Sequence, residues 1–228
     1  MAFIIPKSYK LKLLPETTEK AIKTLKDSFE EKLAKTLNLR RVTAPLFVLS
    51  GTGINDDLNG NEHAVSFPIK SMDDRKAEVV HSLAKWKRMK LGAYGIAPGY
   101  GLYTDMNAIR THEELDNLHS LYVDQWDWEQ TITERDRNLD YLKNTVEKIY
   151  KAIKEIEQKI YAEFPHITPQ LPDNITFLHA EELLRQYPTL PAKDREAKAA
   201  RKYGAIFLIG IGNTLSNGEP HDGRAPDY

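Results

Sequence analysis

The stretch that decides the fold is LHSLYVDQWDWE, residues 118–129. Read with the two-residue period of a strand, it places Val123, Gln125 and Asp127 on one face, and Trp126 and Trp128 on the other. One interpretation is that the indoles pack under a layer of helices while the polar face forms the floor of a pocket for a polar ligand. The other is an edge strand with one wet face. The pattern alone leaves both open.

A second strand precedes this stretch. GLYT at 101–104 follows a glycine-rich loop, and an acidic turn at 111–117 leads into the strand at 121–129. Two strands joined by a polar loop predict an antiparallel hairpin with Arg110 at the start of the connection and Gln125 and Asp127 on the returning arm. An arginine opposite carboxylates forms an ion pair, or a fork that holds a phosphate or a substrate carboxylate.

Other patterns predict helices and further strands around this hairpin. Apolar residues spaced by three and four predict helices at 15–38 and 134–164. Shorter helices are expected at 83–92, which Gly92 would end, at 181–187, and at 193–203, which Gly204 would cap. Short apolar runs predict strands at 46–50, 64–69, 78–82, 174–179 and 205–212. The run at 134–164 is short for a coiled coil and ends at Pro165, so we expect one long helix that covers a sheet. Asn217-Gly218 predicts a hairpin turn.

Composition limits the class of protein. The chain has 32 Lys and Arg against 33 Asp and Glu, so no global field recruits nucleic acid or an anionic membrane. It has no Cys, which excludes disulfides and cysteine metal sites. No apolar run reaches the length of a membrane span. The apolar run at the N-terminus, residues 1–6, is too short for the hydrophobic region of a signal peptide. We therefore expect a cytoplasmic protein without nucleic-acid or membrane partners.

The chemistry-bearing residues suit recognition more than hydrolysis. The seven His show no zinc-type spacing, and no Gly-x-Ser-x-Gly motif occurs. Lys85 and Lys87 are about 200° apart around a helix, so at most one points into a site, and a solvated basic face is the alternative. The polar residues that remain on strands and adjoining loops are Asp56, Ser82, Lys87, Arg110, Gln125 and Asp127. Cations with carboxylates on an antiparallel sheet suit a zwitterion and an anionic phosphate.

Several unusual sequence segments resemble those of a known family. VVHSLAKWKR at 79–88, GLYT at 101–104 and LYVDQWDWE at 121–129 resemble ammonia-dependent asparagine synthetase, also called aspartate–ammonia ligase. GIG at 210–212 and RAPDY at 224–228 match as well, in the family's order. The resemblance implies an α+β fold, an antiparallel sheet flanked by helices as in the catalytic domain of class II aminoacyl-tRNA synthetases, and a homodimer.

The resemblance also implies a reaction. The side-chain carboxylate of L-aspartate attacks the α-phosphate of ATP-Mg²⁺, pyrophosphate leaves, and ammonia displaces AMP from β-aspartyl-adenylate. Arg110 matches the arginine at the α-phosphate, Gln125 would donate to the reacting oxygens, and Asp56 matches the carboxylate that holds the incoming ammonium. The aspartate itself would be held by Ser82, by Lys87 at its α-carboxylate and by Asp127 at its ammonium.

The chain departs from the family at its end. The family continues with further acidic residues for Mg-ATP and a glycine-rich stretch with an arginine, so residues 1–228 are expected to form a single catalytic-type domain that lacks the C-terminal part. One alternative is therefore a truncated relative that binds aspartate or ATP, or only dimerises, without catalysis. An aminoacyl-tRNA synthetase-like enzyme is disfavoured because the sequence shows no anticodon-binding module.

Overall fold

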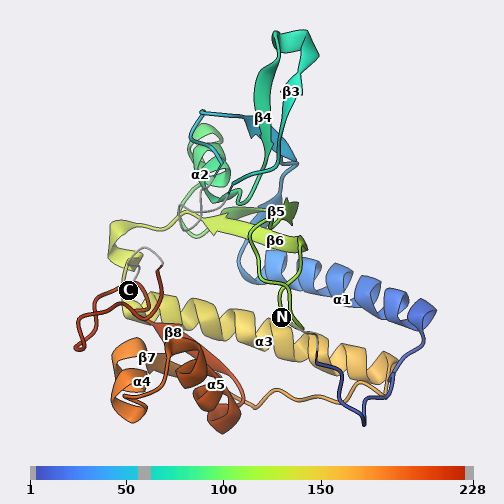
Figure 1. The fold of residues 1–228 in the computed structure, drawn as a ribbon, viewed down its shortest axis with the longest axis vertical. Coiled ribbons are helices and arrows are strands. Elements are labelled where there is room, and N and C mark those ends of the chain that lie inside the picture. The colour runs from blue at the N-terminus through green and yellow to red at the C-terminus, as the bar shows by residue number, and fades with distance from the viewer. Residues whose placement is uncertain (1–3, 56–62, 224–228) are drawn as a thin grey trace. The chain divides into compact units, whose positions relative to one another are not determined.

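The computed structural model describes residues 4–55 and 63–223. The chain divides into two compact units, one made of Met1–Leu11 and Glu30–Thr133 and the other of Lys12–Phe29 and Glu134–Tyr228. Helix α1 (Pro15–Thr36) contributes to both units, its last turns belonging to the first unit (Figure 1). Whether the two units make up one catalytic domain stays a prediction.

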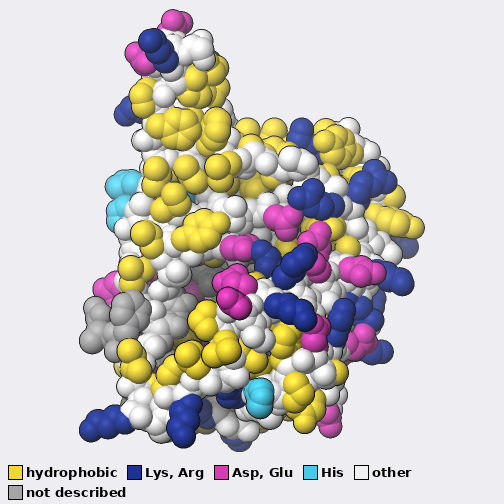
Figure 2. All heavy atoms as spheres, turned by 90° about the vertical axis from the view of Figure 1, so that its right-hand side faces the viewer, with side chains coloured by type: hydrophobic (Ala, Val, Ile, Leu, Met, Phe, Trp, Pro, Cys, Tyr) yellow, Lys and Arg dark blue, Asp and Glu magenta, His cyan; other side chains and the backbone are white. Residues whose placement is uncertain are grey.

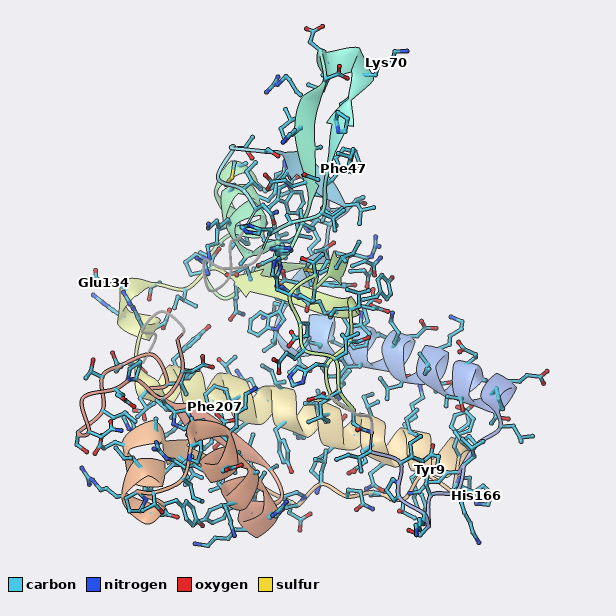
Figure 3. The ribbon with its side chains drawn as sticks, in the orientation of Figure 1. Tyr9, Phe47, Lys70, Glu134, His166 and Phe207 are labelled. Carbon is cyan, nitrogen blue, oxygen red and sulfur yellow. The ribbon has the colours of Figure 1, made fainter. Side chains whose placement is uncertain are left out.

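The first unit holds two three-stranded sheets and helix α2 (Ala84–Ala93). One sheet has the order β1-β5-β6, with β1 (Leu39–Arg41) parallel to β5 (Gly101–Ile109) and β6 (Tyr122–Gln130) antiparallel to β5. The other is antiparallel, with the order β2-β4-β3, and consists of β2 (Phe47–Leu49), β4 (Arg75–Val79) and β3 (Ser66–Ile69). A 3-10 turn at Lys70–Met72 joins β3 to β4, and Figure 3 labels Lys70 at this end of the hairpin.

The predicted antiparallel hairpin is confirmed. Its first strand, β5, extends to Ile109, whereas the sequence predicted a strand only at 101–104. All nine residues of β5 pair with β6, so that Thr104 lies opposite Asp127 and Met106 opposite Gln125. The first residue of β5, Gly101, lies where a side chain would clash with its neighbours. A Cβ at this position would lie 2.3 Å from the carbonyl oxygen of Glu129 and 2.7 Å from the side chain of Leu39.

The core of the first unit lies on the α2 face of this hairpin. Val80, Leu83, Met106 and Ala108 are buried together, with Trp86 of α2 and Val123 of β6 packed against them. These β5 side chains share the sheet face of Gln125 and Asp127, because the register places even-numbered residues of β5 beside odd-numbered residues of β6. The polar face of β6 therefore continues from an apolar core and is not an isolated wet face.

The second unit is built on the long helix α3 (Leu139–Glu163), which the spacing of apolar residues predicted. A 3-10 turn at Glu134–Asp136 precedes α3, and the side chain of Asn138 caps it by accepting from the backbone N–H of Tyr141 at 2.8 Å. One face of α3 buries Ile156 and Ile160, against which Ala21 and Phe29 of α1 pack.

The remaining elements of this unit form a small α/β layer. They are β7 (Thr176–His179), α4 (Ala180–Gln186), α5 (Ala192–Tyr203) and β8 (Ile206–Ile209). Strands β7 and β8 pair in parallel, and Phe207 of β8 is labelled in Figure 3. The predicted hairpin turn at Asn217-Gly218 is confirmed by the hydrogen bond from the Leu215 N–H to the Glu219 carbonyl and by the positive φ of Gly218.

Several predicted boundaries were wrong. The strand predicted at 78–82 ends at Val79, so His81 and Ser82 lie in the turn before α2. The strand predicted as buried at 46–50 is shorter, and Phe47 is 45% exposed at its start (Figure 3). Gly92 lies inside α2 and does not end it. None of the helices that the structure describes is long and apolar enough to cross a membrane.

Candidate functional site

An ion pair joins α2 to β6 at the centre of the candidate site. The ammonium of Lys87 lies 2.6 Å from Oδ2 of Asp127, and Lys87 is completely buried while the Asp127 side chain is 19% exposed. Burial lowers the pKa of Lys87, and the carboxylate of Asp127 opposes that shift. A buried ammonium needs an anion beside it, so this ion pair holds α2 against β6.

Asp127 also holds the start of α2. Its Oδ2 accepts a hydrogen bond from the Leu83 N–H at 3.2 Å, one of the amides that a helix leaves without an internal partner. Ser82, one residue earlier, accepts from the Ala84 N–H through Oγ at 3.1 Å. Ser82, Lys87 and Asp127, predicted from the sequence, are therefore brought together where α2 begins.

Gln125 lies one step further along the same face of β6. Its side-chain nitrogen donates to the sulfur of Met106 at 3.2 Å, on the strand opposite. A thioether is a weak acceptor, so an oxygen of a ligand would be a better partner for this amide. Gln125 is half-buried, which leaves it accessible.

Arg110 extends β5 by one residue. Its backbone N–H donates to the carbonyl of Leu121 at 2.8 Å and so continues the ladder beyond Ile109. Strand alternation puts Arg110 on the same face as Met106 and Ala108, and its side chain is half-buried. Asp127, Gln125 and Arg110 therefore follow one another in a row along one face of the hairpin.

The remaining predicted residue, Asp56, lies outside the described residues. Its neighbour Asn55 is described, and sequence reasoning missed it. The side chain of Asn55 accepts from the His81 N–H at 2.8 Å and donates to the Val79 carbonyl at 3.3 Å. The only sequence signal was an Asn in a polar loop, a type of residue that often hydrogen-bonds to backbone.

The reverse face of the hairpin carries the tryptophans and a separate polar network. Trp126 and Trp128 are half-buried there, on the face of Tyr103, whose hydroxyl donates to Glu30 of α1 at 2.8 Å. Burial and this carboxylate raise the pKa of Tyr103 to about 12. Arg41 reaches Asp105 at 2.9 Å on the same side. This face is held to the end of α1 and contains none of the predicted site residues.

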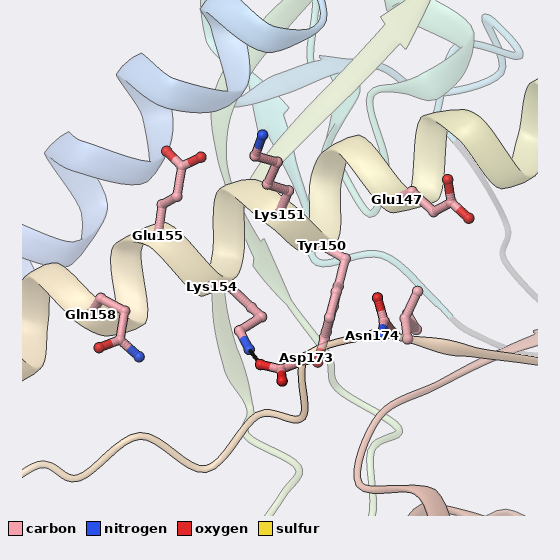
Figure 4. Close-up of a pocket in the computed structure, with 9 residues that line it drawn as sticks. Glu147, Tyr150, Lys151, Lys154, Glu155, Gln158, Asp173 and Asn174 are labelled. Carbon is pink, nitrogen blue, oxygen red and sulfur yellow. Dashed lines mark hydrogen bonds and ion pairs between the residues drawn. The ribbon is translucent and has the colours of Figure 1, made fainter.

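A pocket in the second unit does not contain the predicted residues either. It has a volume of about 520 Å³ and lies between α3 and residues 173–175. In Figure 4, Tyr150 and Lys154 point toward that segment, and Lys154 pairs with Asp173 at 2.8 Å. The Tyr150 hydroxyl donates to the Pro172 carbonyl at 2.6 Å. Tyr150, Lys154 and Asp173 are thus engaged by partners within the protein.

Charged side chains, and the His, Asp and Glu side chains that could bind a metal ion, are not clustered in the part of the chain that the structure describes. On the face shown in Figure 2, basic and acidic side chains are interspersed, in keeping with 32 Lys and Arg against 33 Asp and Glu. Over residues 4–55 and 63–223, no three His, Asp or Glu side chains gather as metal ligands would.

Comparisons with known proteins relate the chain to one family. The family model described as aspartate–ammonia ligase matches residues 16–228. Curated aspartate–ammonia ligases include those of Parabacteroides distasonis, 59% identical over all of this chain, and Clostridium perfringens, 56% identical over 98% of it. The chain spans 66% and 67% of the length of these two relatives.

Solved structures show the fold. The asparaginyl-tRNA synthetase of Entamoeba histolytica in complex with asparaginyl-adenylate superposes with a TM-score of 0.56 at 13% identity, over 85% of this chain and 44% of that one. The Pyrococcus horikoshii asparaginyl-tRNA synthetase, also complexed with asparaginyl-adenylate, gives 0.55 at 15% identity, over 86% and 44%. The predicted fold, an antiparallel sheet flanked by helices as in class II aminoacyl-tRNA synthetases, is therefore confirmed, with parallel pairs β1-β5 and β7-β8 in addition.

Proposed function

The chain belongs to the aspartate–ammonia ligase family, and we propose that it serves the reaction of that family, forming asparagine from L-aspartate, ammonia and ATP. One observation carries the proposal: Asp127 with Lys87, then Gln125, then Arg110 lie in a row along one face of the β5–β6 hairpin. This is the order in which an aspartate ammonium and α-carboxylate, a reacting side-chain carboxylate and a phosphate would follow one another.

The spacing of this row fits such a ligand. Residues two apart on a strand lie about 7 Å apart, which separates Asp127 from Gln125 by about the length of an amino acid. Arg110 follows four residues after Met106, the partner of Gln125, so its Cα lies about 14 Å further along. An arginine side chain is long enough to span part of that distance toward Gln125, which would leave room for a phosphate between them.

The buried ion pair supports recognition of a zwitterion. Lys87 and Asp127 neutralise each other across 2.6 Å. An amino acid adds one carboxylate and one ammonium, so the α-carboxylate can pair with Lys87 and the ammonium with Asp127 without adding net charge. Because Lys87 is completely buried, its interaction with a carboxylate is little screened by water. Ser82 adds a hydroxyl at the start of α2.

In the proposed first step, an oxygen of the aspartate side-chain carboxylate forms a bond to the α-phosphorus of ATP, and the bond from that phosphorus to pyrophosphate breaks. Negative charge grows on the phosphoryl oxygens, where the guanidinium of Arg110 would stabilise it. Gln125 would donate its amide N–H to the reacting oxygens. Removing one such donor typically costs about 3 kcal/mol of transition-state stabilisation.

In the second step, ammonia forms a bond to the side-chain carbonyl carbon of β-aspartyl-adenylate, the bond to AMP breaks and a proton leaves the nitrogen. We assign Asp56 to hold the incoming ammonium and accept that proton. This assignment comes from the family resemblance, because Asp56 lies outside the described residues.

Mg²⁺ enters the proposal only with ATP. Magnesium commonly binds substrate phosphates together with one or two carboxylates and several waters. The described part of the chain offers no cluster of three metal-ligating side chains, so none of its residues is assigned as a ligand. We further propose a cytoplasmic homodimer, as the family resemblance implies. Light scattering that finds a monomer at working concentration would reject the dimer.

Aspartate-dependent exchange of pyrophosphate into ATP tests the function. The full polypeptide of the reading frame should exchange label only when aspartate is present, and Arg110→Ala should abolish exchange. Arg41→Ala is the matched control, because Arg41 lies on the reverse face of the same sheet, paired with Asp105. Aspartate binding by calorimetry without exchange would reject the ligase function in favour of a binding protein.

A further inference from the structure

We propose that Asn55 is a positioning residue for aspartate, which acts by fixing the β4–α2 turn, residues 80–83, that presents Ser82. The inference rests on the proposed function, since it takes Ser82 and Lys87 as part of the aspartate site. The hydrogen bonds of Asn55 to Val79 and His81 are made to their backbone groups. Its influence would pass through the backbone of the turn.

The turn has buried backbone groups that need partners. Val80, His81 and Leu83 are each 1% exposed. A buried N–H or C=O without a hydrogen bond is unfavourable, so each such group constrains the path of the chain. The Val80 N–H donates to the Leu46 carbonyl at 3.1 Å, just before β2 begins at Phe47. Beyond it, two side chains take over.

Asn55 supplies the first of these partners. Its Oδ1 accepts from the His81 N–H at 2.8 Å, and its Nδ2 donates to the Val79 carbonyl at 3.3 Å and to the Glu78 carboxylate at 3.2 Å. One amide side chain thus bonds both an N–H and a C=O of β4 and its continuation, as the backbone of a neighbouring strand would. It continues the β3 edge of β4, where the Val79 N–H bonds to the Val65 carbonyl just before β3 begins at Ser66.

Asp127 supplies the second partner, on the other side of Ser82. It accepts from the Leu83 N–H at 3.2 Å and pairs with Lys87 at 2.6 Å. Ser82 therefore lies between two anchors, Asn55 before it and Asp127 after it. Removing Asn55 frees one end of the turn, so Ser82 loses a fixed position while the ion pair stays intact.

The test compares Asn55→Ala with Asn55→Gln and Asn138→Ala. Asn138 is a matched control because it also accepts from a backbone N–H, that of Tyr141, and donates to a backbone carbonyl, that of Arg135, but at the start of α3 in the second unit. Asn138→Ala should lower thermal stability and leave aspartate binding unchanged. Asn55→Ala should weaken aspartate binding by about 10- to 100-fold, the range that a small misplacement of binding groups produces. Asn55→Gln, which keeps the amide group, should restore part of the affinity for aspartate.

Three readouts separate positioning from general damage. In Asn55→Ala, calorimetry with L-aspartate should give the weaker Kd, and exchange kinetics should show a raised KM for aspartate with a nearly unchanged KM for ATP. Hydrogen exchange should accelerate in the peptide that spans residues 80–84. Unchanged aspartate affinity in Asn55→Ala, or a defect confined to the use of ammonia, would overturn the inference while leaving the proposed function intact. Wild-type protein that binds no aspartate would refute both.

Discussion

The buried ion pair predicts that its two members contribute unequally to stability. Asp127→Asn leaves the ammonium of Lys87 fully buried without its paired carboxylate, whereas Lys87→Met leaves a carboxylate that is 19% exposed and still accepts from the Leu83 N–H. Removing one partner of a buried pair costs about 3–5 kcal/mol when an unpaired buried charge remains. Because Asn keeps an oxygen as an acceptor, we expect about 3 kcal/mol for Asp127→Asn, at the lower end of that range.

The Lys87→Met variant should lose only about 1 kcal/mol, since Met replaces the buried stem of lysine and the exposed carboxylate keeps one N–H donor. The double variant should be more stable than Asp127→Asn alone, because it contains no buried unpaired charge. In a protein of this size, 3 kcal/mol corresponds to a fall in Tm of about 6–12 °C.

The defect of Asp127→Asn should also depend on pH. Burial already lowers the pKa of Lys87 below 10.5, and loss of the Asp127 carboxylate removes the two largest interactions that raise it. Between the folded and unfolded pKa values the unfolded state binds more protons, so the free energy of unfolding rises with pH in that window. The window is wider in Asp127→Asn, so its loss of stability should be smaller at pH 10 than at pH 7.

Urea unfolding followed by tryptophan fluorescence measures these differences. The chain has three tryptophans, Trp86, Trp126 and Trp128, and all lie in the first unit, so the signal reports the unit that contains the pair. The reasoning would be refuted by Lys87→Met costing as much as Asp127→Asn, or by a double variant no more stable than Asp127→Asn. An Asp127→Asn defect of equal size at pH 7 and pH 10 would contradict it as well.

Three further outcomes are expected. Absorbance at alkaline pH should show one tyrosine that titrates near pH 12 and is absent in Tyr103→Phe. The pKa of Tyr103 in the folded protein is raised above the unfolded value of 10.0. The stability that Tyr103 contributes is therefore fully present below pH 10 and is lost as the pH rises through about 12. Gly101→Ala should destabilise the protein in urea by about 1–3 kcal/mol through overpacking against the Glu129 carbonyl, whereas Gly92→Ala, with nothing within 4 Å of its Cβ inside α2, should stabilise it by up to ~1 kcal/mol. Gln125→Ala should lower kcat for aspartate-dependent exchange by about 100-fold or more without lowering the urea midpoint to the extent of Asp127→Asn.

The hairpin could be predicted because its information is local. Period-two alternation over residues 121–129 fixes which side chains share a face, and the structure pairs Asp127 with Thr104 and Gln125 with Met106 as an antiparallel hairpin requires. Long helices were equally accessible, since α3 follows directly from apolar residues at spacings of three and four.

Non-local contacts were not accessible. The parallel pairing of β7 with β8 depends on how α4 and α5 carry the chain back, which the strands do not encode. The contact of Asn55 with the His81 N–H joins residues 26 apart, and a polar loop gives no sign of its partner. The end of β4 at Val79 was missed because the apolar residues Val79 and Val80 continue across the strand end into a buried turn.

The choice between a wet edge and the floor of a site rests on Lys87. A run of basic residues on a helix is typical of a solvated face, and the sequence pattern of residues 85–90 does not separate Lys87 from its neighbours. In the structure Lys87 is 0% exposed, whereas Arg88, the next residue, keeps its side chain 67% exposed beside Glu129. Burial of an ammonium is unfavourable by itself, and replacing a buried ion pair by apolar residues of similar volume is often neutral or stabilising. Stability therefore gives no reason for a buried pair of Lys87 with Asp127, whereas the proposed binding of a substrate carboxylate does, and on that proposal the polar face of β6 is part of the binding site.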